Sequence, residues 1–242
     1  EAGAEIIPVS RGSATLVDAV SECMRYYVSN CDTTHLAVGS AIGANVFLKI
    51  CAYSTAQISR ELKKQLFEEF GEIPKMKLVN VIGGGSSAIG FWSEFIDYPK
   101  KHVELIGVEA KYCAPLTTNA KLAILHGAAQ YCLTDKNGQI KETHSISAGL
   151  DYPGVSPLHC FLKDTGRARY CSASDEQALT AFKLVTKLEP SVKPSLEPAH
   201  CLHEVIRLAP KLSQDEIIIY NNCGHAYKDR KIIQDKIGYF PS

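Results

Sequence analysis

Two hydrophobic periods alternate along the chain, one typical of buried strands and one typical of amphipathic helices. Runs rich in β-branched residues predict buried strands at residues 36–43 (ending in a turn of small residues), 79–82, 103–108 and 217–220. Apolar residues three and four positions apart predict helices at residues 13–28, 58–70, 89–96, 175–185 and 198–206. This alternation indicates an α/β fold with a doubly wound, mostly parallel sheet and helices on both faces.

Single residues mark where several of these elements begin or end. Gly71 is placed to end the helix before it, and Ser174 with Gln177 forms a capping box at the start of another. Pro198 suits the first turn of the last predicted helix. Between residues 111 and 169 the pattern loosens, with a turn at 135–138 and a long loop at 147–157 that we expect to be functional.

The stretch from Val79 to Gly90 combines an apolar strand, three consecutive glycines, two serines and the start of a helix. Glycines let backbone N–H groups approach a ligand, and the first turn of a helix adds N–H groups without intrahelical partners. Phosphate fits such donors, and Ser86 and Ser87 add hydroxyl groups. The pattern therefore favours an anion site at 83–87, with a ligand-free strand-to-helix turn as the alternative.

A dinucleotide site is a second interpretation of the same glycines. Gly83, Gly85 and Ala88 match the pattern Gly-x-Gly-x-x-Gly/Ala. Glu109 follows the next strand, where an acidic residue would meet a ribose hydroxyl. The pattern is short and often accidental, and it gives no role to the turn at Cys223.

The composition of the chain limits which binding partners and which cellular compartment we expect. The 242 residues carry 26 basic and 26 acidic side chains, so there is no electrostatic reason to expect nucleic acid or an anionic membrane. No apolar run approaches the roughly 20 residues of a membrane-spanning helix. Nine cysteines without a Cys-x-x-Cys pair indicate reduced thiols in the cytoplasm rather than a disulfide framework or a zinc site.

Eight motifs follow one another along the chain in a fixed order. They are Gly12–Leu16, Gly83–Gly90, Ile106–Glu109, Asp135–Ile140, Ser145–Pro153, Gly166–Ala168, Ser195–Glu197 and Gly224 with Lys228–Asp229. Together they resemble the tryptophan synthase β chain from Gly3 to about Asp229. Long motifs in one order are much more specific than a single glycine pattern.

The resemblance implies a fold-type II pyridoxal-phosphate enzyme, a lyase that condenses L-serine with indole to L-tryptophan and water, as a β-chain homodimer. It implies that residues 1–52 end the N-terminal domain, including part of its mobile subdomain. Residues 53–242 would form the C-terminal domain that binds the cofactor phosphate. The family's Schiff-base lysine and catalytic glutamate lie upstream of the matched segments, and the chain opens abruptly at Glu1. We therefore expect a C-terminal fragment that is inactive alone.

The resemblance also assigns a cofactor-binding set. Ser40 matches a threonine beside the cofactor, and Cys223 stands where the family has a serine bonded to the pyridine nitrogen. Glu197 matches a cofactor-side glutamate, with a charge at a helix start as the alternative. The complete set is Ser40, Gly83, Gly84, Gly85, Ser86, Ser87, Glu197 and Cys223.

Two further assignments concern the serine substrate and a cation. Asp151 matches the aspartate that helps to close the serine site. The backbone carbonyls of Gly83, Tyr152 and Gly154 match the positions around a monovalent cation, Na⁺ or K⁺.

Three departures from the family pattern bear on function. The asparagine of Gly-Gly-Gly-Ser-Asn-Ala is here Ser87, and the turn Ser-Gly-Arg-Gly-Asp-Lys-Asp is here Cys223–Asp229. These changes leave open a non-catalytic relative that binds a ligand or a partner. A lysine that contacts the tryptophan synthase α chain is here Val17, which puts the α chain in question as a partner.

Overall fold

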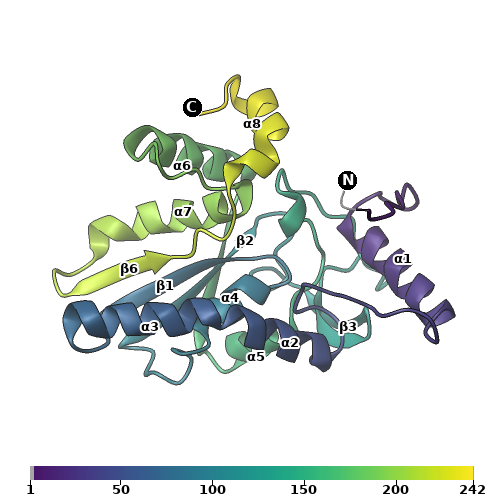
Figure 1. The fold of residues 1–242 in the computed structure, drawn as a ribbon, viewed down its shortest axis with the longest axis horizontal. Helices are drawn as coiled ribbons and strands as arrows, with labels where there is room; N and C mark the ends of the chain where they lie inside the picture. The colour runs from purple at the N-terminus through teal and green to yellow at the C-terminus, as the bar shows by residue number, and fades with distance from the viewer. Residues whose placement is uncertain (1–2, 242) are drawn as a thin grey trace.

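The computed structural model describes residues 3–241 and is built around a parallel sheet. The strands are β1 (Lys75–Ile82), β2 (Val103–Ala110), β5 (Ala168–Ala173) and β6 (Glu216–Tyr220). They pair in the order β5-β2-β1-β6, and every pair is parallel (Figure 1). A separate antiparallel pair consists of β3 (Lys121–Leu125) and β4 (Ala128–Cys132).

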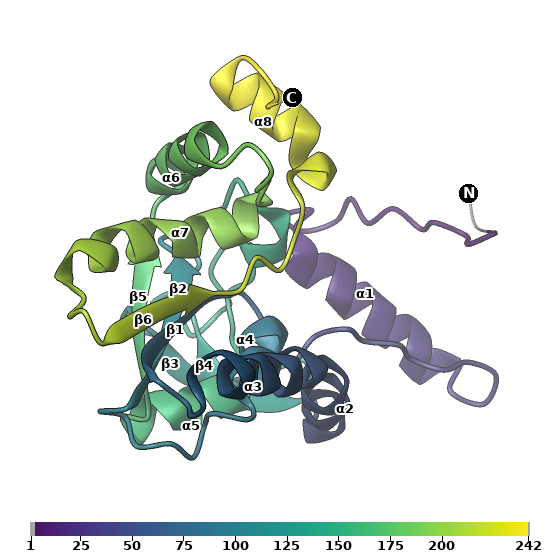
Figure 2. The same cartoon turned by 60° about the vertical axis from the view of Figure 1, so that its left-hand side comes forward.

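Helices cover both faces of the parallel sheet, because successive residues of its central strands bury apolar side chains on opposite sides. One face packs against α3 (Gln57–Phe70), α4 (Ser86–Trp92) and α5 (Pro157–Asp164). The other packs against α7 (Leu196–Leu208), which α6 (Asp175–Leu188) and α8 (Arg230–Ile237) cover in turn. Figure 2 shows α6 and α7 on one side of the sheet and α3 and α5 on the other. The predicted doubly wound α/β fold is confirmed.

The chain reverses its direction of winding at β1. From β1 it proceeds through α4 to β2 and then to β5, and it returns through α6 and α7 to β6 on the other side of β1. The strands β1 and β6 are neighbours, but the chain continues from their carboxyl ends to opposite faces of the sheet. In open α/β sheets ligands bind at the carboxyl ends of the strands at such a switch point.

Several helix boundaries follow the sequence signals. Gly71 caps α3 in the left-handed conformation, with φ 75°. Ser174 and Gln177 form the capping box of α6. Helix α7 begins at Leu196, two residues before the predicted start at Pro198, with Ser195 as its N-terminal cap.

Other elements differ from the prediction. The expected strand at the start of 36–43 is wrong, because this segment is irregular and both neighbours of β1 are already β2 and β6. Helix α2 (Asn45–Thr55) and strand β5 were not predicted. The domain boundary expected at residue 52 falls within α2 and stays a prediction.

Helix α1 (Leu16–Ser29) confirms the helix predicted at 13–28, but none of its residues is buried. It stands beside the sheet domain in Figures 1 and 2, joined to it by irregular chain. Three short 3₁₀ helices complete the described chain: Ala148–Leu150, Ala209–Lys211 and Ala226–Asp229.

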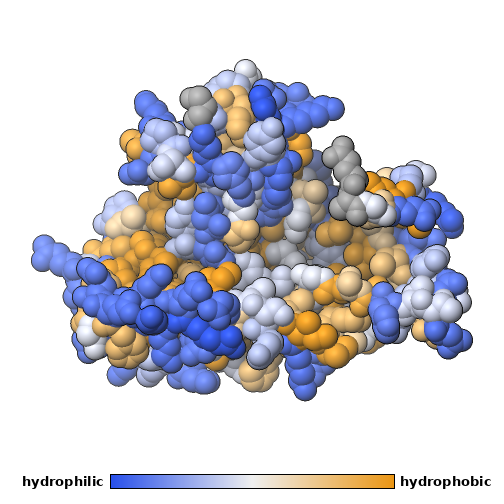
Figure 3. Space-filling view, in the orientation of Figure 1, coloured by the Kyte–Doolittle hydropathy of each residue, from blue (hydrophilic) through white to orange (hydrophobic). Residues whose placement is uncertain are grey.

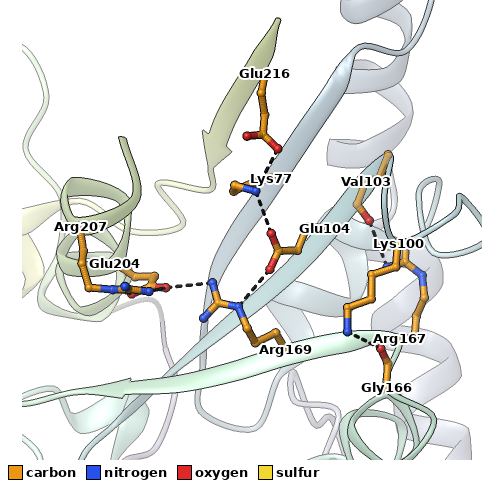
Figure 4. Close-up of polar contacts among 10 residues, drawn as sticks. All are labelled: Lys77, Lys100, Val103, Glu104, Gly166, Arg167, Arg169, Glu204, Arg207 and Glu216. Atoms are coloured by element: carbon orange, nitrogen blue, oxygen red, sulfur yellow. Dashed lines mark hydrogen bonds and ion pairs between the residues drawn. The ribbon is translucent and has the colours of Figure 1, made fainter. Parts of the chain in front are cut away.

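An ion-pair network crosses the sheet near the amino ends of its strands (Figure 4). The Lys77 ammonium lies 2.9 Å from Glu216 and 2.9 Å from Glu104. Arg169 lies 3.0 Å from Glu104 and 3.0 Å from Glu204, whose other partner is Arg207. The network joins β6, β1, β2, β5 and α7 at the edge opposite the carboxyl ends.

Helix α2 exposes an apolar stripe of Val46, Ile50 and Tyr53, and Figure 3 shows apolar surface there at the lower right. Within residues 3–241, no helix has the length and hydrophobicity that a bilayer crossing requires.

Candidate functional site

A cavity of about 530 Å³ lies at the carboxyl ends of β1 and β6, where the winding reverses. All eight residues of the predicted cofactor-binding set line it: Ser40, Gly83, Gly84, Gly85, Ser86, Ser87, Glu197 and Cys223. One side of α1 forms an apolar wall with Leu16, Ala19, Val20, Cys23 and Met24. The structure thus brings six separate chain segments to one site, the sixth being Gly149–Tyr152.

At two positions of the loop after β1, neighbouring side chains lie so close that only glycine fits. A Cβ at Gly84 would collide with the Ser40 hydroxyl. Gly85 has φ +97°, a conformation that other residues rarely adopt, and a Cβ there would collide with the His159 ring. The glycines therefore let this loop pass between Ser40 and His159.

The backbone N–H groups of residues 84–87 have no acceptor among the residues that the structure describes. The Gly84 carbonyl accepts a hydrogen bond from Ser156 N at 3.1 Å, and the Gly85 carbonyl accepts from Ile89 N at 3.1 Å. Within residues 3–241, the N–H groups of 84–87 donate to no protein atom. Helix α4 has only seven residues, so these donors, rather than a long helix dipole, make the cavity suitable for an anion.

Ser87 connects the loop to the strand ends. Its hydroxyl oxygen accepts hydrogen bonds from the Asn80 amide at 3.2 Å and from the Asn221 amide at 3.1 Å. Burial raises the pKa of the Cys223 thiol, and a hydrogen bond from Ser87 offsets part of the increase. Cys223 therefore faces the cavity as a neutral thiol.

Glu197 lies in the first turn of α7 and faces the cavity as a carboxylate. Its oxygens accept hydrogen bonds from Ser195 Oγ and Lys228 Nζ, both at 2.7 Å. Burial alone would raise its pKa, but the bonds from Lys228 and Ser195 outweigh it and leave the pKa below the usual value.

The residues assigned to substrate and cation lie less closely together. Tyr152 lines the cavity, whereas Asp151 and Gly154 do not. Asp151 lines a neighbouring cavity of about 470 Å³ and accepts a hydrogen bond from the Cys113 thiol at 3.5 Å. Gly154 forms an isolated antiparallel bridge with Cys132. The assignments of Asp151, Gly83, Tyr152 and Gly154 stay predictions.

No cluster of three or more His, Cys, Asp or Glu side chains suited to a metal ion occurs in the part of the chain that the structure describes. This finding concerns side chains, and the predicted cation ligands are backbone carbonyls.

Sequence reasoning missed two histidines that hold the walls of the cavity. His159 lies behind the loop, 2.9 Å from the Gly85 carbonyl. His126 joins the Tyr152 hydroxyl at 2.8 Å to Ser21 of α1 at 2.9 Å. Their partners lie far away in sequence, so no local pattern marks either residue.

Glu109 does not occupy the position of a ribose-binding acid. It is 1 % exposed, and its oxygens accept hydrogen bonds from Leu116 N at 2.9 Å and Thr117 Oγ1 at 2.8 Å. Burial raises its pKa to about 8. A neutral carboxyl enclosed in the protein cannot reach a ligand in the cavity, which argues against the dinucleotide interpretation.

Comparison with curated proteins finds similarity over nearly the whole chain. A tryptophan synthase β chain of Allorhizobium ampelinum is 44% identical over 235 residues, which cover 94% of this chain and 57% of the relative. The chain thus spans little more than half the length of the curated relative that it matches. No protein-family model matches. The resemblance to the tryptophan synthase β chain is confirmed.

Two solved structures share the fold. A fungal L-serine ammonia-lyase from Rhizomucor miehei aligns with a TM-score of 0.53 and 19% identity, covering 74% of this chain and 56% of that one. A T.th. threonine deaminase aligns with a TM-score of 0.50 and 15% identity, covering 70% of this chain and 56% of that one. These similarities show that the chain shares an α/β fold with the two enzymes.

Proposed function

Because the chain is similar along nearly all of its length to the tryptophan synthase β chain, we propose that it forms the part of such an enzyme that holds the phosphate of pyridoxal phosphate. The parent enzyme would be a lyase that condenses L-serine with indole to give L-tryptophan and water. The Schiff-base lysine and the catalytic glutamate would come from outside these 242 residues.

One observation carries the proposal. The cavity at the switch point collects the glycine-rich loop, Ser40, Glu197 and Cys223. The loop presents N–H groups that have no acceptor in the described protein. Several free donors at one side of a cavity fit the oxygens of a phosphate group, and the volume suits a small cofactor.

Each of the cavity residues would have a separate role in binding the cofactor. When bound, pyridoxal phosphate supplies an electron sink for bonds at the α-carbon of an amino acid. The loop 83–87 binds the phosphate, and Ser40 lies beside it. Cys223 would face the pyridine nitrogen as a weak donor and acceptor, which suits an uncharged nitrogen. Glu197 would lie beside the cofactor, and the apolar wall of α1 would limit the access of water from the opposite side of the cavity.

The remaining assignments extend the same proposal. Asp151 would move to the serine site when substrate binds, because it lies outside the cavity here. The carbonyls of Gly83, Tyr152 and Gly154 would surround Na⁺ or K⁺. The enzyme would be a cytoplasmic homodimer, with residues 1–52 belonging to its N-terminal domain. The α chain is the partner with the weakest support, because Val17 replaces the contacting lysine.

Thermal protection by ligands tests the proposal. We expect inorganic phosphate and pyridoxal phosphate to raise the melting temperature more than NAD does, since the donors suit one phosphate group. A ligand at about 100 times its dissociation constant stabilises by about 2.7 kcal/mol. Stronger protection by NAD than by pyridoxal phosphate would contradict the proposal.

A single substitution makes the test specific to the loop. Ser86→Asp adds a carboxylate to the anion site at the first position of α4, where a negative charge favours the helix. The variant should fold but lose protection by both phosphate compounds. Ser191→Asp, at an exposed position outside the cavity, serves as the matched control and should keep the protection.

A further inference from the structure

His159 is a fully buried residue to which the proposed function gives no role. It lies in the first turn of α5, with Nε2 2.9 Å from the Gly85 carbonyl oxygen and Nδ1 2.9 Å from the Tyr170 hydroxyl. Its ring also packs against Trp92 in a T-shaped arrangement, with 5.5 Å between the ring centroids. The imidazole is therefore held on three sides.

The two hydrogen bonds determine the tautomer of His159. A carbonyl oxygen only accepts, so Nε2 must carry a proton and donate to Gly85. Burial lowers the pKa of His159 to about 4, so the ring is neutral near pH 7 and Nδ1 is bare. The Tyr170 hydroxyl then donates to Nδ1.

The start of α5 holds two successive carbonyls of the glycine loop. Ser156 N donates to the Gly84 carbonyl at 3.1 Å, and His159 donates to the Gly85 carbonyl. In a planar trans peptide the N–H and the C=O point in opposite directions. The N–H groups of Gly85 and Ser86 therefore point away from α5. No residue of α5 lines the cavity, whereas Gly85 and Ser86 do.

The Gly85 carbonyl has a second donor, Ile89 N of α4 at 3.1 Å, and without His159 that single hydrogen bond would oppose rotation of the peptide between Gly85 and Ser86 toward the opposite orientation. That orientation would turn a carbonyl oxygen, and its partial negative charge, toward the anion. We propose that His159 is a positioning residue that keeps this peptide in the anion-binding orientation. This inference rests on the proposed function of the loop 83–87.

Inorganic phosphate binding to wild type and two variants tests the inference. His159→Leu removes the donor while keeping an apolar side chain, and His159→Gln retains an N–H group near the position of Nε2. Calorimetry should show binding weakened by at least about tenfold in His159→Leu and restored to within about threefold of wild type in His159→Gln. Equal affinity in wild type and His159→Leu would overturn the inference but leave the proposed function intact.

A second measurement applies if His159→Leu does not fold, which the fluorescence of Trp92 would reveal. The ¹⁵N chemical shifts of His159 in the wild-type protein should identify the Nε2–H tautomer. Tyr170→Phe removes the donor to Nδ1 but leaves the Nε2–H bond to the Gly85 carbonyl, so this variant should keep the Nε2–H tautomer and bind phosphate within about threefold of wild type. A wild-type Nδ1–H tautomer, or phosphate binding lost in Tyr170→Phe while the Nε2–H tautomer persists, would overturn the inference. A wild-type protein that binds no phosphate would overturn the proposed function as well.

Discussion

At the scale of single residues, His159 makes the stability of the protein depend on pH. Its pKa is about 4 in the folded protein, against 6.5 for an unperturbed histidine. Between these two pKa values the unfolded chain binds more protons than the folded protein. The contribution of His159 to the free energy of unfolding therefore decreases as the pH decreases. From about pH 7.5 to about pH 5 the decrease amounts to about 2 kcal/mol.

Glu109 acts in the opposite sense, because its folded pKa of about 8 lies above the reference value of 4.5. Its contribution to stability increases as the pH decreases through that range. The test is therefore the difference between wild type and His159→Gln in denaturant unfolding, followed by Trp92, the one tryptophan of the sequence. We expect the wild type to lose about 2 kcal/mol more than the variant between about pH 7.5 and about pH 5. A difference that does not change with pH would contradict the assignment.

The residues of the site divide into those that the sequence could predict and those that it could not. The glycine loop was predictable, because consecutive glycines and serines between a strand and a helix have a local meaning. The supporting contacts were not, since Ser87 meets Asn221 across 134 positions and Gly85 meets His159 across 74. Such pairs are created by the fold. Glu109 failed as a ribose ligand for the same reason, because its burial depends on Leu116 and Thr117.

At the scale of elements, Lys77 joins three neighbouring strands. Its side chain is 17% exposed and contacts Glu104 on β2 and Glu216 on β6. Burial alone would raise the pKa of Glu104, but the bonds from Lys77 and Arg169 hold it below the usual value. The network therefore stabilises the sheet fully at a pH above the pKa values of its carboxylates, and less at acidic pH.

Replacing Lys77 by an uncharged residue should destabilise the protein, because two partly buried carboxylates, Glu104 and Glu216, lose a partner. We expect Lys77→Met to lower the free energy of unfolding by about 2 kcal/mol near neutral pH, less than for an isolated buried pair because Arg169 and Lys75 remain. The deficit should shrink in acid as the carboxylates become protonated. Urea unfolding measures both values.

The matched control is Lys64→Met, which removes an exposed pair with Glu68 on α3. Exposed helix pairs contribute about 0.3–0.5 kcal/mol, so this variant should unfold almost like wild type. Equal losses in the two variants would contradict the structural role of the buried network.

The elements that the sequence predicted have strong internal signals. Helix α3 combines apolar residues at four-residue spacing with a glycine cap, and β1 and β2 are rich in valine, leucine and isoleucine. Strand β5 contains Arg169, Tyr170 and Ser172, and only its pairing with β2 makes it a strand. Residues 36–40 carry a strand-like pattern but have no strand to pair with. Pairing partners, rather than local propensity, decided both cases.

At the scale of the whole molecule, the ion pairs that stabilise the sheet and the cavity proposed to bind a ligand lie at opposite ends of its strands. The ion-pair network joins the amino ends of the strands, and the cavity lies at their carboxyl ends. The alternation of strands and helices was enough to predict a doubly wound sheet. It did not predict the strand order β5-β2-β1-β6, and that order places the connections after β1 and β6 on the two sides of one cavity.

The crystal structure of the protein with pyridoxal phosphate would test the central claim most directly. We expect phosphate oxygens at hydrogen-bond distance, about 2.7–3.2 Å, from the N–H groups of the loop 84–87. We also expect the pyridine nitrogen to face Cys223. A phosphate group bound outside this loop would contradict the account. So would pyridoxal phosphate bound elsewhere on the protein, with the cavity empty and the ring away from Cys223.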